Sequence, residues 1–141
     1  MTKEVKVSVC GTQWGEEIEE NTIETRADGE YYCKNGSHYV FYEEPMEECS
    51  KPSKTRIKWK ENTLELIRQG VVDTHMIFQE NQTHMTDYAT PYGKLVLGVN
   101  TNSVKVEERE SAISIFVEYQ LETEEEVLSR HRLKIRICPA N

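Results

Sequence analysis

Polar side chains interrupt the apolar alternation of several segments, and their types suit binding or catalysis. Arg68 falls on the same phase as the apolar residues around it. An unpaired buried charge is costly, so an inward-facing arginine needs a partner. The planar guanidinium of Arg68 suits the carboxylate or phosphate of a small amphipathic ligand. The alternative is an internal salt bridge, or a side chain that reaches out through the mouth of the fold.

A second group of polar residues falls near the C-terminus. Ser129 and His131 share one face of a segment, and Tyr119 is expected beside them on the preceding segment. Histidine titrates near neutral pH, so this cluster suits acid–base chemistry. However, no carboxylate of the alternating pattern is placed to orient the imidazole, and no G-x-S-x-G nucleophile motif occurs. A hydrogen-bonded core histidine is the preferred interpretation, and no catalytic residue is predicted.

Metal binding has little support in the sequence. Cys33 and His38 are expected to face each other across a turn, which is close enough for two ligands. Two further ligands are not identifiable, so ordinary core packing is preferred and neither a metal nor a cofactor is predicted. The cysteines show no CxxC or zinc-knuckle spacing and are expected to be reduced thiols: Cys10, Cys33, Cys49 and Cys138.

A tight corner, Thr90-Pro91-Tyr92-Gly93, precedes the longest extended run of the chain. Proline fixes φ, glycine permits a sharp reversal and tyrosine can close the end of a barrel, so a purely structural role is sufficient. Equally, Tyr88, Thr90 and Tyr92 can line the entrance of a pocket. The sequence leaves these two interpretations open.

The candidate residues lie in segments where apolar and polar residues alternate with a period of two, which predicts β-strands. Val5, Val7 and Val9 mark a first strand that is expected to end at Gly11, and residues 12–21 are expected to form a loop. A long strand from residue 22 to residue 34 follows, with a kink at Asp28-Gly29.

The next strand is joined through Asn35-Gly36, the strongest hairpin signal in the chain, because both central residues of a type I′ turn need positive φ. The expected register pairs Lys34 with Ser37, Cys33 with His38, Tyr32 with Tyr39 and Tyr31 with Val40. The face that carries Tyr31, Cys33, His38, Val40 and Tyr42 is expected to point inward.

A basic stripe alternates with apolar residues over residues 54–60 and is interpreted as a solvated outer face. If Glu61-Asn62 is a two-residue turn, Trp59 faces Leu64, Ile57 faces Leu66, and Thr55 faces Arg68. Residues 75–80 and 84–88 are expected to form another hairpin, in which Phe78 lies opposite Met85.

The run after the corner changes phase halfway along. Leu95, Leu97 and Val99 occupy odd positions, whereas Val104 and Val106 occupy even ones. Since a one-residue slip exchanges the two faces of a strand, a bulge or bend is predicted within residues 100–103. Two alternating strands, 113–121 and 127–137, complete the chain as a hairpin, with Glu118 expected near Arg130 on the outer face.

These elements predict an all-β fold: a single antiparallel up-and-down barrel of eight to ten strands over residues 1–141. Closure of the sheet removes two exposed edges, and a β-sandwich is the alternative. Such a barrel is either filled by side chains or holds one small ligand.

The charge of the chain bears on its partners. The formal charge of −8 and the sequence pI near 5.1 argue against general binding to nucleic acid or to anionic membranes. The N-terminus lacks the apolar core of a signal peptide, and no segment approaches the roughly 20 apolar residues of a membrane-spanning helix. A cytoplasmic location is expected.

Four blocks of the sequence stand out: GTQ from Gly11, DGEYYCKNGSHYVFYEE from Asp28, LIRQG from Leu66 and DYATPYGKLVLGVNTNSV from Asp87. In this order they resemble the YwiB-like bacterial family. The resemblance implies a lipocalin-like, calycin-type barrel of unknown function and brings no assigned activity, substrate or cofactor.

Three classes of function follow. The first is a module that holds a small apolar or amphipathic ligand in the barrel. The second is a protein-interaction or structural module with a filled interior, for which a homodimer is one arrangement. An enzyme ranks last, because no catalytic constellation emerges. The residues predicted to bind a ligand are Arg68, Tyr88, Thr90, Tyr92, Tyr119, Ser129 and His131.

Overall fold

Ten antiparallel strands follow one another along the chain, and most of them pair with their neighbours in sequence. This computed structural model describes residues 3–15, 19–44, 53–70, 73–90 and 93–140. Its described residues contain no helix able to cross a membrane. The strands are β1 Glu4–Trp14, β2 Asn21–Lys34, β3 Ser37–Glu44, β4 Ser53–Lys60, β5 Thr63–Gln69, β6 Thr74–Gln79, β7 Gln82–Thr90, β8 Gly93–Arg109, β9 Ala112–Glu122 and β10 Val127–Pro139.

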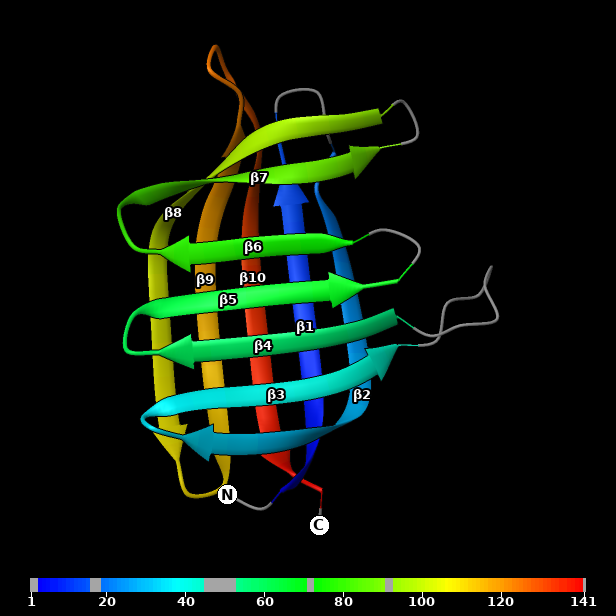
Figure 1. Ribbon diagram of the computed structural model, residues 1–141, viewed down its shortest axis with the longest axis vertical. Coiled ribbons are helices and arrows are strands. Elements are labelled where there is room, and N and C mark those ends of the chain that lie inside the picture. Colours follow the sequence, from blue (N-terminus) through cyan, green and yellow to red (C-terminus); the bar gives the residue numbers. More distant parts are fainter. Residues whose placement is uncertain (1–2, 16–18, 45–52, 71–72, 91–92, 141) are drawn as a thin grey trace.

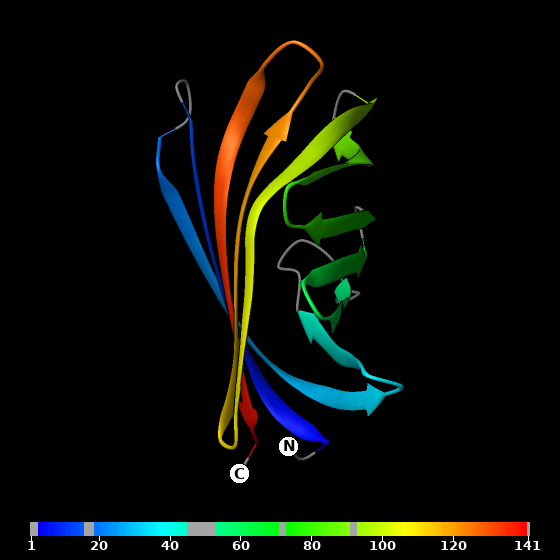
Figure 2. The same ribbon diagram turned by 90° about the vertical axis from the view of Figure 1, so that its left-hand side faces the viewer.

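The strands form one sheet in the order β6-β5-β4-β3-β2-β1-β10-β9-β8-β7, which curls into a nearly closed barrel. The predicted all-β antiparallel barrel is therefore confirmed. One layer, β3 to β6, runs across the long axis of the molecule, and the layer behind it, with β9, β10 and β1, runs along that axis (Figure 1). Turned on its side, the molecule shows the two layers enclosing a common interior (Figure 2).

Two bent strands join the layers, as in other barrels whose strands switch sheets at corners. The first, β2, pairs with β1 as far as Glu30 and with β3 from Gly29 onward. The predicted kink at Asp28-Gly29 thus lies at the point of exchange. The second, β8, pairs with β7 up to Thr101 and with β9 from Gly98, and its register shifts between Thr101 and Ser103, which confirms the predicted bulge.

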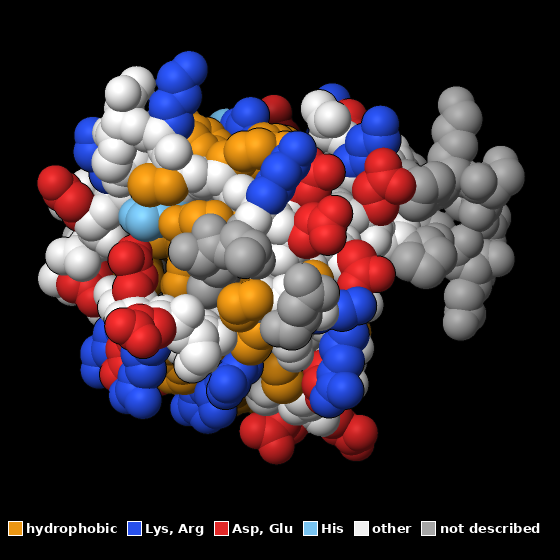
Figure 3. Space-filling model, turned by 90° about the horizontal axis from the view of Figure 1, so that it is seen from below, with side chains coloured by type: hydrophobic (Ala, Val, Ile, Leu, Met, Phe, Trp, Pro, Cys, Tyr) orange, Lys and Arg blue, Asp and Glu red, His pale blue; other side chains and the backbone are white. Residues whose placement is uncertain are grey.

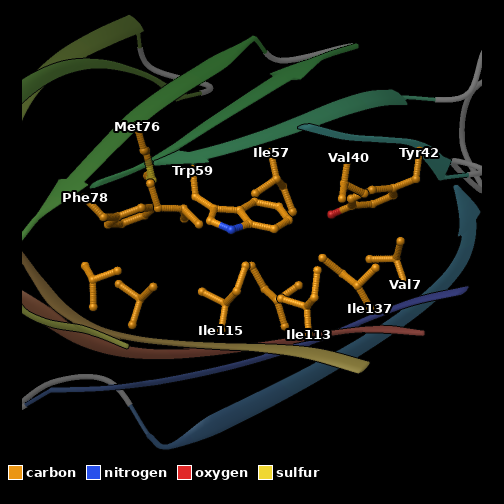
Figure 4. Packing of buried hydrophobic residues seen from close by; sticks show 14 of the residues in the cluster. Val7, Val40, Tyr42, Ile57, Trp59, Met76, Phe78, Ile113, Ile115 and Ile137 are labelled. Atoms are coloured by element: carbon orange, nitrogen blue, oxygen red, sulfur yellow. The ribbon is translucent and has the colours of Figure 1, made fainter. Parts of the chain in front are cut away.

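The interior between the layers is packed with apolar side chains around Trp59. In Figure 4 the aromatic and aliphatic residues of β3, β4 and β6 face those of β1, β9 and β10 across this space. Burial of this apolar surface is the main stabilising contribution to the fold. The largest fully buried side chains are Trp59, Phe78, Ile57, Leu64, Ile115, Ile135, Ile137, Val5, Val7, Val40, Val99 and Val117.

The two hairpins predicted from short turns have the expected registers. Asn35 and Gly36 both have positive φ, 53° and 78°, and all four predicted pairs between β2 and β3 form. The pairs around Glu61-Asn62 form as well. One detail differs: Cys33, predicted to point inward, is exposed and lies at the end of β2.

The predicted hairpin of residues 75–80 and 84–88 is wrong. β6 and β7 are the two ends of the sheet, and β7 pairs with β8 instead. The turn directs the chain toward β8, since the Asn81 amide donates to the Thr101 carbonyl at 2.9 Å and Glu80 accepts from the Val104 amide at 2.9 Å. Phe78 is buried, whereas Met85 is 62% exposed.

Three smaller expectations also need correction. β1 does not end at Gly11 but continues to Trp14, because β10 and β2 both pair with its second half. Leu95 is 51% exposed, because β8 extends past the covered part of the barrel. Glu118 pairs with Arg132 rather than Arg130, since β9 continues to Glu122 opposite Val127 and a bulge after Val127 shifts the hairpin register by one further residue.

Candidate functional site

The structure brings together three of the residues predicted to form a site, Tyr119, Ser129 and His131. The β9–β10 register places His131 directly opposite Tyr119. The two rings stack at 4.7 Å with an interplanar angle of 6°, and Phe78 of β6 packs on Tyr119 from across the barrel. Ser129 Oγ lies 2.8 Å from His131 Nε2. The cluster therefore lines the inner wall of the barrel.

The environment of this cluster does not favour acid–base catalysis. Burial lowers the pKa of His131 below its ordinary value, so the imidazole is neutral at physiological pH. Among the described residues, no carboxylate contacts His131; its hydrogen bond is with Ser129. A neutral imidazole without an orienting carboxylate lacks the third member of a catalytic triad.

Arg68 lies on the opposite wall, on the inward face of β5 between Thr55 and Thr74. Its Nη2 is 3.3 Å from Glu44 Oε1, which is the internal ion pair considered from the sequence. The Arg68 side chain is 43% exposed, so the pair is at the edge of the interior. Beside it, burial and the Glu44 carboxylate raise the pKa of Tyr42 to about 12.

Several buried polar atoms of β4 and β5 have no hydrogen-bond partner of good geometry among the described residues, although the Tyr42 hydroxyl interacts with Thr55 and Arg68. Buried polar groups are nearly always bonded, so each exception calls for an explanation. Of the six such side-chain atoms in the described part of the chain, four lie on the inward faces of β4 and β5. These four are Ser53 Oγ, Thr55 Oγ1, Trp59 Nε1 and Arg68 Nε.

Solvent reaches the inward face of the barrel beside these atoms. The inward residues of β1 are buried at Val5 and Val7 but only partly buried from Val9 onward, and each of β5 and β10 also has partly buried inward residues beside buried ones. Gly11 leaves additional room, because an added Cβ would meet only Leu133 Cδ1 within 4 Å, at 3.9 Å. The partly buried inward residues are Val9, Gly11, Gln13, Leu66, Arg68, Tyr119, His131 and Leu133.

The remaining predicted site residues are at the β7–β8 connection. Tyr88 is opposite Leu95 and Thr90 opposite Gly93 in the backbone register. Gly93 has φ of 119°, which fits the role assigned to glycine in the predicted corner. Tyr92 lies outside the described residues.

Another polar cluster, not predicted from the sequence, connects β2, β3 and β8. His38 Nδ1 lies 2.6 Å from the Tyr31 hydroxyl and Nε2 lies 3.3 Å from Glu108 Oε1, while the His38 ring stacks on Trp59 at 5.0 Å. Burial raises the pKa of Tyr31 to about 12, the opposite of what an activated nucleophile requires. The cluster thus holds β3 against β8.

The predicted pair Cys33 and His38 does not form a metal site with other residues. Within the described ranges, no group of three or more His, Cys, Asp or Glu side chains is arranged to hold a metal ion. Cys10, Cys33 and Cys138 are free thiols, and Cys49 lies outside the described residues.

Two hollows that sequence patterns did not indicate occur among the described residues. The larger, of about 930 Å³, lies where β1 and β2 meet β3, β4 and β5; it reaches the inward Tyr42 and Thr55, and charges of both signs surround the apolar Phe41 and Ile67. The smaller, of about 670 Å³, lies over β10, β1 and β2. Seen from the end near the termini, acidic and basic side chains surround apolar ones on the surface (Figure 3).

Comparison with known proteins agrees with the fold. A family model described as a domain of unknown function, DUF1934, matches residues 7–135. The chain belongs to the DUF1934 family. The crystal structure of the YwiB protein from Bacillus subtilis is similar, with a TM-score of 0.82 and 22% identity over 99% of this chain and 93% of that chain. At this identity the likeness shows the fold alone. A search of curated proteins finds no match.

Proposed function

We propose that this DUF1934 barrel binds a small amphipathic ligand with an acidic head group on its partly open inward face. The carrying observation is the group of partnerless polar atoms on β4 and β5, which include Thr55 Oγ1 and Arg68 Nε. Hydroxyl and guanidinium groups donate hydrogen bonds to carboxylate or phosphate oxygens. A bound acidic group would satisfy donors for which the described residues offer no hydrogen bond of good geometry.

The surroundings of these donors fit an amphipathic molecule. Leu66 and Leu133 are partly buried apolar residues on the inward face, and they offer contacts for a hydrocarbon body. Glu44 contacts Nη2 of the Arg68 guanidinium, and the buried Arg68 Nε has no hydrogen-bond partner among the described residues. In this proposal the ligand lies between two facing walls, which carry Arg68 on one side and Tyr119, Ser129 and His131 on the other.

A second candidate is a module that binds another protein through its outer face. It is supported by the dense packing around Trp59 and by the larger hollow. In that case the inward donors contribute nothing to function, and ligand binding would be insensitive to them.

A dansyl-labelled fatty acid tests the first proposal, because its carboxylate and chain match the two halves of the site. Fluorescence titration is expected to show saturable binding that Arg68→Met weakens about tenfold, the effect of losing a charged hydrogen bond. The matched control is Arg130→Met, which removes an exposed arginine of β10. Equal binding by both variants and the unmodified protein would exclude a role for Arg68.

Thr55→Val provides an independent check. It removes a buried hydroxyl that has no partner, so the protein is expected to become more stable while the probe binds more weakly. Thr101→Val is the control, because the Thr101 hydroxyl is also buried and partnerless but lies on β8. It is expected to change stability alone. Weaker binding in both variants, or in neither, would contradict the proposed location.

A further inference from the structure

One stretch of β2 has an unpaired edge. Residues 21–30 pair with β1 on one side, but β3 covers the other side only from Gly29 onward. The hydrogen bonds of the described residues include none between the backbone of this free edge, Asn21 to Asp28, and a strand other than β1. The pairing with β1 continues through this stretch without a register shift. Such an edge is a ready template for another strand.

The corresponding edge of β8 is protected, which makes the β2 edge unusual in this molecule. Beyond Thr101, β8 has lost β7 as a partner, yet Glu80 accepts from the Val104 amide and Glu108 pairs with His38. The free edge of β2 has no proline and no bulge, two of the devices that commonly block strand addition, although it carries charged side chains. Instead it exposes an apolar side chain, Ile23, at 62%.

The side chains of this edge are complementary to themselves. When two copies of a strand pair antiparallel about a two-fold axis, residues on one face meet residues on the same face. Centring the axis on Thr25 places Glu24 opposite Arg26 of the second copy, twice, and Ile23 opposite Ala27 twice. Centring it on Glu24 or on Arg26 would instead place two like charges opposite each other, which is destabilising.

We propose that the protein forms a two-fold dimer by antiparallel pairing of β2 edges centred on Thr25. In the monomer Arg26 Nε lies 3.0 Å from Glu24 Oε1 of the same strand, and both side chains point to solvent. In the dimer Arg26 of each copy pairs with Glu24 of the other copy in place of Glu24 of its own strand. The backbone N–H and C=O groups of the two edges then bond to each other. Because one short strand is added per copy, the interface is small and assembly depends on protein concentration.

Sedimentation velocity of the full-length protein at increasing concentration tests this assignment. The unmodified chain is expected to shift from monomer to dimer. Glu24→Arg and Arg26→Glu each set like charges opposite each other at two places, and each is expected to weaken dimerisation about tenfold. The double variant E24R/R26E restores opposite charges and is expected to recover the dimer. A monomer at every concentration, or single variants that dimerise as well as the unmodified protein, would overturn the proposal.

Amide hydrogen exchange of the unmodified protein supplies a test that needs no variant. Amides of the free edge are expected to exchange more slowly as the concentration rises, whereas those of β6 and β7 keep their rates. Dimerisation with unchanged exchange over residues 21–28 would place the interface elsewhere and refute β2 pairing. The sedimentation and hydrogen-exchange results do not depend on ligand binding inside the barrel. They therefore test the dimer independently of the proposed function.

Discussion

Replacement of Gly29 by alanine is expected to destabilise the barrel at the point where β2 passes from one layer to the other. Gly29 pairs with Val5 of β1 and with Tyr42 of β3. A Cβ at this position would lie 2.8 Å from the Phe41 carbonyl oxygen, 3.1 Å from Val7 Cγ2 and 3.3 Å from Tyr42 Cβ. The first of these atoms is backbone of a paired strand, so it cannot move aside without disturbing the sheet.

The size of the effect follows from this overpacking. Forcing an extra methyl group into a packed site typically costs about 1–3 kcal/mol. Alanine also lowers the conformational entropy of the unfolded chain, which raises the free energy of unfolding by about 0.4–1 kcal/mol where alanine fits without strain. Here the clash with backbone outweighs that gain, and the melting temperature is expected to fall by roughly 3–8 °C for a domain of this length.

Gly11→Ala is the matched control, because the same methyl group would meet only Leu133 Cδ1 at 3.9 Å, an ordinary contact. That variant is expected to be as stable as the unmodified protein or slightly more stable. Thermal unfolding followed by circular dichroism measures both. An unchanged melting temperature for Gly29→Ala, or an equal loss for Gly11→Ala, would refute the steric account of the β2 bend.

Three further predictions concern buried polar groups. Burial lowers the pKa of His131 in the folded state, so as pH falls below about 6.5 the unfolded chain is protonated at this residue before the folded protein is, and the free energy of unfolding decreases. His131→Gln is expected to flatten this pH dependence in urea unfolding measured between about pH 5 and 7.5. An unaltered pH dependence would contradict the expected role of His131. Thr101→Val is expected to stabilise the protein by about 1 kcal/mol in urea unfolding, since it removes a buried partnerless hydroxyl, and a loss of stability would reveal a bond there. His38→Phe keeps a ring on Trp59 but leaves Tyr31 and Glu108 unbonded, so the free energy of unfolding should fall by about 1–3 kcal/mol, and no change would mean that the cluster does not hold β3 to β8.

Local patterns predicted much of the sheet because strand pairing across a two-residue turn is a local property. The turn at Asn35-Gly36 fixes the register of β2 and β3, and the phase change around Thr101 required a bulge. The predicted neighbours Tyr119, Ser129 and His131 meet for the same reason, since they belong to adjacent strands.

Contacts across the closing barrel could not be predicted in this way. β6 and β7 do not pair, because they form the two ends of the sheet. Hydrogen bonds of Glu80 and Asn81 with β8 direct the chain toward β8 at this turn. Glu108 meets His38 from a strand far along the sequence, so no alternation or turn indicated that ion pair. The partnerless donors of β4 and β5 were likewise hidden, because an alternating pattern gives the face of Thr55 but not its bonds.

Native mass spectrometry of the protein purified from its own host tests the ligand-binding proposal most directly. The intact mass is expected to exceed the polypeptide mass by that of a small acidic amphipathic molecule, which denaturation releases. Arg68→Met is expected to lower the occupancy of this molecule, whereas Arg130→Met is not. An intact mass equal to that of the polypeptide, or a retained molecule whose occupancy is the same in both variants, would refute ligand binding at Arg68.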